Sequence, residues 1–275
     1  MMDLRMLFPL GKSRCFTVSY DDGRIFDARL LGLLGKYGIK GTFNLNSAFL
    51  GWENQYVLPD SLPELYKDQE IASHTKTHIK MAGTDSGLLT GQVWNDRCCL
   101  EKLSKTIVTG FAYPFGVYDN KVIQLLKACG IQYARTVYST HSFELPKDFL
   151  QWHPTCHHDD DDVFDLLEKF CGKDTDFLKK SRLFYLWGHS YEFDEKNNWD
   201  RIEEIFARVH QCLDEIWFAT NGQIYGYCKA YEMLIFSAEG TSVYNPSSQT
   251  VWFAIDEKTY SIEPGKMINI APSFT

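Results

Sequence analysis

The chain has 275 residues, of which 44% are hydrophobic and 15% aromatic, and its formal net charge is −8 at pH 7. This composition supports a packed core and excludes a disordered or collagen-like chain. Asp and Glu (36) outnumber Lys and Arg (28), whereas a protein that binds a nucleic-acid backbone clusters basic residues, so we expect no nucleic-acid partner. No apolar run approaches the roughly 18 residues that cross a bilayer, and residues 1–12 show no secretory signal pattern. We therefore expect a cytoplasmic protein with no membrane partner, of undetermined oligomeric state.

Strand and helix patterns alternate along most of the chain. β-rich segments bounded by turn residues predict strands at residues 15–20, 41–45, 70–73, 109–113, 132–136, 183–187 and 216–220. Apolar residues at helical spacing predict helices at residues 25–34, 62–67, 88–103, 120–129, 163–170, 199–213 and 222–233. Such alternation produces a parallel sheet, and seven or eight repeats predict an α/β fold, a distorted (β/α)7–8 barrel.

The last forty or so residues have a different pattern. Short alternating runs at residues 251–255, 260–262 and 267–270 are separated by turn residues, which is typical of antiparallel strands. We predict a barrel over residues 1–236 and a small C-terminal antiparallel β appendage over residues 237–275 that packs on it.

Polar residues follow the predicted strands where those strands end. In parallel α/β folds the carboxyl ends of the strands line the active site, so these residues are candidates for chemistry. They are Asp21 and Asp22, His74 and His78, the run from Tyr113 to Gly116, Arg135, and His189. Each has an ordinary explanation when taken alone, since Asp-Asp-Gly is a common turn and a single histidine is more often structural than catalytic.

Their position on one rim favours a metal site. Two histidines, His74 and His78, and one carboxylate, Asp22, make a set of three ligands that leaves positions open for water and substrate, as a catalytic metal requires. The adjacent Asp21 then has a separate task, because a carboxylate beside the metal can take the proton of the attacking water.

The order of these residues resembles the polysaccharide deacetylases of carbohydrate esterase family 4. That family has a strand ending in T-F-D-D-G, then H-[ST]-x-x-H, a loop similar to R-P-P-Y-G, and a late strand with L-x-H. The matching segments, over about residues 14 to 221, are Thr17-Val18-Ser19-Tyr20-Asp21-Asp22-Gly23, Ser73-His74-Thr75-Lys76-Thr77-His78, Phe111-Ala112-Tyr113-Pro114-Phe115-Gly116 and Leu186-Trp187-Gly188-His189.

The resemblance implies a divalent metal, most often zinc with cobalt, nickel or manganese as alternatives, held by Asp22, His74 and His78. It further implies Asp21 as the general base, His189 as the general acid, and the backbone N–H of Phe115 as a donor to the developing oxyanion. The substrate it implies is an acetylated carbohydrate, with Tyr113, Pro114, Trp152, Trp187 and Tyr191 as candidate substrate-binding residues.

The chain departs from the family pattern in the third and fourth motifs. Ala112 stands where the family has an arginine that pairs with the base, and we hypothesise that Arg135, on the next strand, supplies the missing guanidinium. The acidic fourth motif is not clear, although Trp152 lies near its expected place. The tract from Cys156 to Asp162 is either a solvated loop leading into a helix or a loop that lines the substrate groove.

Three functions remain open from the sequence. The first is a metal-dependent hydrolase that removes N-acetyl groups from a sugar or polysaccharide. The second is an amide or cyclic-imide hydrolase on the same barrel, because fold and metal do not fix the substrate. The third is a barrel that has lost catalysis and binds carbohydrate.

Overall fold

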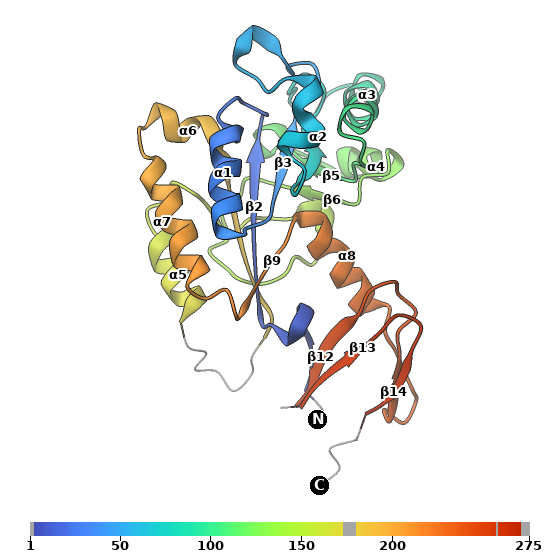
Figure 1. Cartoon of the computed structure of the whole chain (residues 1–275). Coiled ribbons are helices and arrows are strands. Elements are labelled where there is room, and N and C mark those ends of the chain that lie inside the picture. Colours follow the sequence, from blue (N-terminus) through green and yellow to red (C-terminus); the bar gives the residue numbers. More distant parts are fainter. Residues whose placement is uncertain (1–2, 173–179, 257, 271–275) are drawn as a thin grey trace.

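A computed structural model describes residues 3–172, 180–256 and 258–270. Its centre is a parallel sheet with strands in the order β6-β5-β4-β3-β2-β8-β7, and β9 also pairs with β2 (Figure 1). The strands are β2 (Arg14–Asp21), β3 (Gly41–Leu45), β4 (Glu70–Ser73), β5 (Gly110–Ala112), β6 (Tyr133–Arg135), β7 (Cys156–His157), β8 (Arg182–His189) and β9 (Ile216–Phe218). The predicted α/β class with parallel strands is confirmed.

The sheet curls until its two edges are joined by one extended segment. Trp152 makes a parallel bridge to Arg135 of β6, and a few residues later β7 pairs with β8. The backbone N–H of Thr155 donates to the carbonyl of Tyr185, which continues the connection along β8. The sheet is therefore a distorted barrel in which irregular backbone replaces part of one strand.

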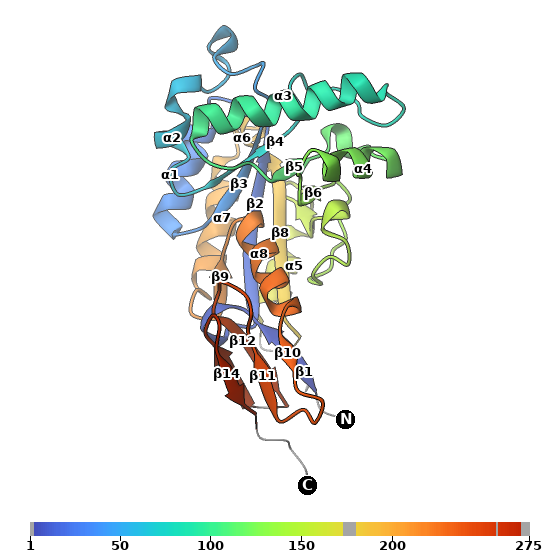
Figure 2. The same ribbon diagram turned by 90° about the vertical axis from the view of Figure 1, so that its right-hand side faces the viewer.

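Helices cover the outside of the curled sheet (Figures 1 and 2). The α-helices are α1 (Asp27–Tyr37), α2 (Leu62–Leu65), α3 (Ser86–Ser104), α4 (Asn120–Ala128), α5 (Val163–Cys171), α6 (Ser190–Glu195), α7 (Trp199–His210) and α8 (Asn221–Glu232). Short 3-10 turns are η1 (Pro9–Gly11), η2 (Trp52–Asn54), η3 (Pro59–Ser61), η4 (Pro114–Gly116) and η5 (Phe149–Gln151). Helix α7 shows why these segments are helical, since its buried residues recur at three- and four-residue steps: Trp199, Ile202, Ile205, Phe206 and Val209.

The structure differs from the predicted elements at short segments. Strand β5 ends before Tyr113, because Pro114 cannot donate to the next strand and begins a 3-10 turn. The one-turn helix α2 is shorter than the predicted residues 62–67, and β7 and α6 were not predicted. Segments this short lack a measurable period.

The predicted antiparallel appendage is present as two small sheets. One contains β1 (Leu4–Leu7), β12 (Val251–Ile255) and β13 (Lys258–Ile262), and the other β10 (Ile235–Phe236), β11 (Ser242–Tyr244) and β14 (Met267–Asn269). The Tyr227 hydroxyl of α8 donates to the carbonyl of Leu7 and accepts from the N–H of Trp252, which attaches the appendage to the barrel. The first strand of the chain thus joins its last strands, while a domain boundary at residue 236 stays a prediction.

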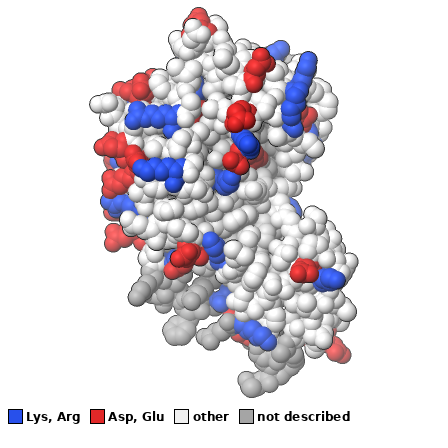
Figure 3. Space-filling view, viewed as in Figure 1, with Lys and Arg blue, Asp and Glu red and all other residues white. Residues whose placement is uncertain are grey.

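The charge distribution on the surface and the composition of the helices can be compared with what nucleic-acid binding and membrane insertion require. On the face in Figure 3, Lys and Arg alternate with Asp and Glu instead of forming a basic patch. Among the described helices, none combines the length and the apolar character needed to cross a membrane.

Candidate active site

Asp22, His74 and His78 converge at the carboxyl end of the sheet. Asp22 follows β2, and the histidines follow β4, which is separated from β2 only by β3. The Nε2 atoms of both histidines lie 3.9 Å from Asp22 Oδ1, and one ligand atom from each of the three residues falls within 4.8 Å of the others. The predicted ligand set is therefore assembled.

The protonation of His74 suits a metal ligand. Its Nδ1 lies 2.8 Å from the carbonyl oxygen of Ala112, which can only accept, so the ring proton is on Nδ1 and the Nε2 lone pair faces Asp22. Burial lowers the pKa of His74 despite Asp21 and Asp22 nearby, which keeps the imidazole neutral. Two imidazoles and a carboxylate are a donor set that fits zinc or a similar divalent ion.

The backbone is strained at two of these ligands and at Phe115, whose ring contacts one of them. Asp22 has a φ of 79°, His78 of 51° and Phe115 of 58°, all in the left-handed region that residues other than glycine seldom adopt. Such conformations persist where the surrounding contacts hold them, and they concentrate at functional sites. The exposed Phe115 ring also contacts the His78 ring edge-on, with centroids 4.6 Å apart.

Asp21 is buried between three polar neighbours. Arg135 Nη2 forms an ion pair with Asp21 Oδ2, the Asn44 amide donates to Oδ1 at 2.8 Å, and His74 Nε2 lies 3.7 Å from Oδ2. Burial alone would raise the pKa of Asp21, but the charge of Arg135, assisted by His74 and His189, lowers it to about 2. Asp21 is therefore an ionised carboxylate at neutral pH, as a general base must be.

Arg135 occupies the place of the missing family arginine. Arg135 on β6 is paired in register with Ala112 on β5. The neighbouring strand therefore carries the guanidinium that position 112 lacks. Its side chain is 1% exposed and lies over the Trp187 ring, 4.5 Å from the centroid. The structure places Arg135 beside Asp21, where we hypothesised it from the sequence, and its role as partner of the base stays a prediction.

His189 lies beside Asp21 on the neighbouring strand. The two residues are paired in register between β2 and β8, so their side chains leave the same face of the sheet. Burial lowers the pKa of His189, but the Glu192 carboxylate, Asp21 and Asp22 outweigh that effect and raise the pKa above its ordinary value. A histidine held partly protonated near neutral pH is suited to donate a proton.

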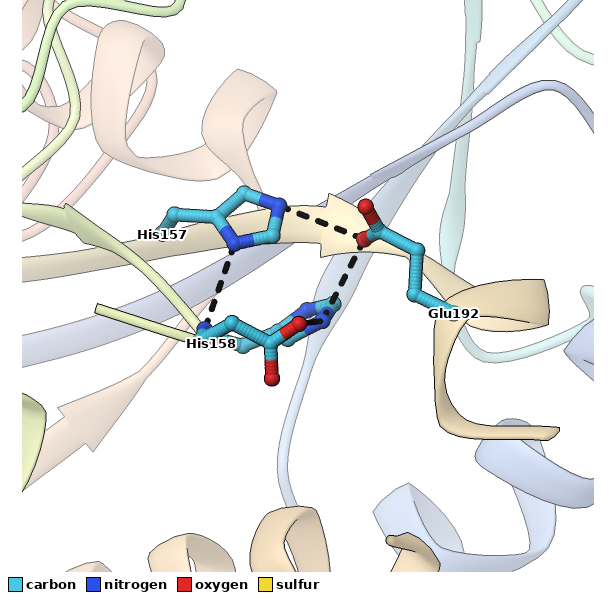
Figure 4. A group of neighbouring side chains, drawn as sticks. His157, His158 and Glu192 are labelled. Carbon is cyan, nitrogen blue, oxygen red and sulfur yellow. Dashed lines mark hydrogen bonds and ion pairs between the residues drawn. The ribbon is translucent and has the colours of Figure 1, made fainter. Parts of the chain in front are cut away.

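Glu192 is the common partner of three histidines. Its Oε2 lies 3.3 Å from Nδ1 of His189, 3.2 Å from Nε2 of His157 and 3.3 Å from Nε2 of His158. Figure 4 shows the rings of His157 and His158 directed at this carboxylate. Burial raises the pKa of Glu192, but His157 and His189 hold it far below the usual range, so Glu192 is a fixed negative charge behind His189.

A second metal site is one interpretation of His157, His158, Asp159 and Glu192, since one ligand atom from each lies within 4.8 Å of the others. The hydrogen bonds favour another interpretation. The N–H of Asp159 donates to His157 Nδ1 at 3.2 Å, so the ring proton of His157 is on Nε2 and donates toward Glu192. Lys196 pairs with Asp159 at 2.5 Å. We interpret the cluster as hydrogen-bonded support for Glu192.

Three predicted substrate-binding residues do not reach the surface, and their prediction is wrong. Trp152 is 1% exposed and packs edge-on against Tyr133, Phe149 and Tyr185, because it sits in the segment that closes the barrel. Tyr113 and Pro114 are also buried, with the Tyr113 hydroxyl donating to the carbonyl of Leu150. Trp187 and Tyr191 are partly exposed, and both rings contact that of His189.

The tract from Cys156 to Asp162 leads into helix α5, as the first alternative predicts, but it is not a solvated loop along its whole length. His158 is fully buried, stacked on Tyr20 with centroids 5.7 Å apart, and Asp160 accepts from the N–H of His157. The tract is a structural part of the barrel wall. The sequence interpretation missed these roles and that of Asn44, although Asn44 lies at the end of a predicted strand, where the same rule selects it.

Replacing Glu192 by Gln is expected to shift the pH dependence of the reaction. Loss of the negative charge lowers the pKa of His189, and a general acid is inactive once deprotonated. The alkaline limb of the kcat profile should therefore move to lower pH, which acetate release measured across pH would reveal. Asp194→Asn, an exposed change on the same helix, is the control. An alkaline limb that stays in place would show that Glu192 does not act on His189.

Known proteins support the fold. Residues 11–134 match the family model described as polysaccharide deacetylase. A Mycobacterium smegmatis protein provisionally assigned as a polysaccharide deacetylase superposes with a TM-score of 0.60 at 15% identity, over 83% of this chain and 94% of that one. A family 4 acetyl xylan esterase from Clostridium thermocellum, solved with a cobalt ion, gives 0.51 at 13% identity, over 77% and 90%.

Coverage is lower for another solved structure. The chain covers 55% of the Streptococcus pyogenes deacetylase PplD, which corresponds to 44% of this chain, at 18% identity and a TM-score of 0.43. No curated protein matches the sequence. Residues 11–134 are therefore similar to the polysaccharide deacetylase family, and the chain has the fold of the carbohydrate esterase family 4 enzymes.

Proposed function

We propose that the protein is a metal-dependent hydrolase that removes N-acetyl groups from an N-acetylated sugar or polysaccharide. The observation that carries the proposal is the convergence of three metal-ligating side chains with a buried, ionised Asp21 and with His189 at one end of the sheet. The family of the domain supports deacetylation of a carbohydrate.

Asp22, His74 and His78 would hold the metal. When bound there, a divalent ion supplies Lewis acidity that polarises the acetyl carbonyl and the attacking water. Zinc is the ion that we expect from the two imidazoles and one carboxylate, and cobalt, nickel or manganese would find the same donors.

The residues of the chain move the protons. Asp21 accepts the proton of the attacking water, and Arg135 keeps the Asp21 carboxylate ionised and oriented for that role. The N–H of Phe115 donates to the oxygen that becomes negative as the carbonyl is attacked. His189 then donates its proton to the departing nitrogen, since an amine leaves only when protonated, and Glu192 orients the His189 ring.

Metal analysis combined with a screen for acetate release tests this function. We expect about one divalent ion per chain and acetate release from oligomers of N-acetylglucosamine, abolished by a chelator and restored by added metal. Activity confined to small cyclic imides or amides would favour the second hydrolase. Binding of sugars with no turnover of any acetylated compound would favour a barrel that has lost catalysis.

A further inference from the structure

The inner face of strands β2 and β3 is polar, whereas the interior of a (β/α) barrel is usually filled by branched apolar side chains. Alternate positions of the two strands carry hydroxyl, amide or carboxylate groups, and all of these side chains are buried: Thr17, Ser19, Asp21, Thr42 and Asn44. The residues between them, such as Val18 and Phe43, belong to the apolar core. Burial of polar groups costs free energy unless each one finds a hydrogen-bond partner, so these side chains depend on one another.

Asn44 holds the oxygen of Asp21 that Arg135 does not contact. The Asn44 amide donates to Asp21 Oδ1 at 2.8 Å, whereas Arg135 pairs with Oδ2. The same amide nitrogen lies 2.8 Å from Ser19 Oγ and 3.3 Å from the carbonyl oxygen of Tyr20. Carboxylate and carbonyl oxygens only accept hydrogen bonds, so the nitrogen of the Asn44 amide must face them. The contacts on Oδ1 and Oδ2 together fix the plane of the Asp21 carboxylate.

A chain of hydrogen bonds continues from Asn44 to Tyr185 on β8. Ser19 Oγ accepts from the Asn44 amide, and the Ser19 hydroxyl is in turn hydrogen-bonded to the Tyr185 phenol. The Tyr185 oxygen also accepts from the side-chain amide of Asn221 at 2.5 Å. The Tyr185 ring is 1% exposed and packs edge-on against Trp152, so its hydroxyl has a fixed position.

The first residue of helix α8 extends the chain toward the other end of the sheet. Asn221 Oδ1 accepts from Thr17 Oγ1 at 3.1 Å, and the Asn221 N–H donates to Thr42 Oγ1 at 3.0 Å. Thr42 donates to Glu70 Oε2 at 2.8 Å, at the first residue of β4. The hydrogen bonds around Asn44 are therefore part of a network that is anchored on four strands and one helix.

We propose that Asn44 is a positioning residue for the base Asp21, and that Ser19 and Tyr185 hold the Asn44 amide in place. A carboxylate acts as a base only when the accepting oxygen points at the attacking water, and a misplacement of about 1 Å can lower turnover about 10²-fold. Arg135 supplies the charge that keeps Asp21 ionised, while the uncharged Asn44 supplies the orientation. The inference rests on the proposed function for the role of Asp21.

Turnover of Asn44→Ala and Tyr185→Phe tests the inference, with Tyr133→Phe as the matched control. Tyr133 is also 1% exposed and packs edge-on against Trp152, but within the described ranges its hydroxyl has no hydrogen-bond partner. We expect kcat for acetate release to fall about 100-fold in Asn44→Ala and about ten-fold in Tyr185→Phe, with KM and metal content close to those of the wild type. Tyr133→Phe should keep the wild-type kcat. If Asn44→Ala does not fold, Tyr185→Phe decides, because it removes a single oxygen atom.

A double-mutant cycle tests the same contacts without using activity. If Tyr185 acts on Asp21 through Ser19 and Asn44, the effects of Tyr185→Phe and Asp21→Asn on the free energy of unfolding should not be additive. The effects of Tyr133→Phe and Asp21→Asn should be additive, because the Tyr133 hydroxyl shares no partner with Asp21. Denaturant unfolding of the single and double variants measures both.

The outcomes separate this inference from the proposed function. Wild-type kcat in folded Tyr185→Phe, or an equal loss in Tyr133→Phe, would overturn the positioning role. So would a loss of kcat that is accompanied by loss of the metal, or additive effects of Tyr185→Phe and Asp21→Asn on unfolding. Non-additive effects in a protein that releases acetate from no sugar would contradict the proposed function and leave the positioning of Asp21 by Asn44 standing.

Discussion

Replacing Asp21 by Asn is expected to lower kcat by about 10²- to 10⁴-fold while the protein still binds its metal. Asn is nearly isosteric and lacks the charge and the basicity that accept a proton. The metal ligands Asp22, His74 and His78 are untouched, so metal content measured after dialysis should stay near one ion per chain. A drop in turnover with full metal content would separate the base from the ligands.

His78→Ala is the contrasting variant. It removes one of the three ligand atoms that lie within 4.8 Å of one another, so the metal should be lost on dialysis and activity with it. His78 is partly exposed, and its loss should therefore disturb folding less than changes at buried Asp21, which thermal unfolding can verify. If His78→Ala keeps its metal, or if Asp21→Asn turns over normally with metal chelated, the assigned roles are wrong.

The fold was predictable from segments whose hydrophobic pattern extends over many residues. Helix α7 buries side chains at three- and four-residue steps, strand β2 is one continuous buried run, and the alternation of such segments is enough to indicate a parallel sheet. Closure of the barrel was not predictable, because it depends on Trp152, which lies in irregular backbone and bridges to β6. The pairing of β1 with β12 is likewise a contact between the ends of the chain that no local pattern contains.

The candidate site was predictable because its motif residues follow strands of one parallel sheet. The carboxyl ends of such strands lie at the same edge of the sheet. Asp21, Asp22, His74, His78 and His189 follow strands of one parallel sheet, so their proximity follows from strand order. The prediction of aromatic substrate-binding residues was wrong for another reason. The type of side chain alone does not distinguish a buried tryptophan such as Trp152 from an exposed one such as Trp52. The exposure of Trp52 depends on the loop that carries it.

Arg135→Met is expected to cost about 3–5 kcal/mol of stability, because it leaves the buried Asp21 carboxylate without its cation. The loss should depend on pH. The pKa of Asp21 is about 2, below its ordinary value of 3.8, so the pair stabilises the wild type above pH 3.8 and stops doing so as the pH falls toward 2. Denaturant unfolding should therefore show the largest difference between the two proteins near neutral pH and a smaller one in acid.

The same change should alter catalysis in a way that destabilisation alone does not. Without Arg135, burial raises the pKa of Asp21, so the acidic limb of the kcat profile should move to higher pH. Arg14→Met is the matched control, since Arg14 is also a buried arginine, at the opposite end of β2 from Asp21. It should lower stability and leave the profile in place. An acidic limb unchanged in Arg135→Met would mean that the guanidinium on β6 holds the barrel together and does not control the base.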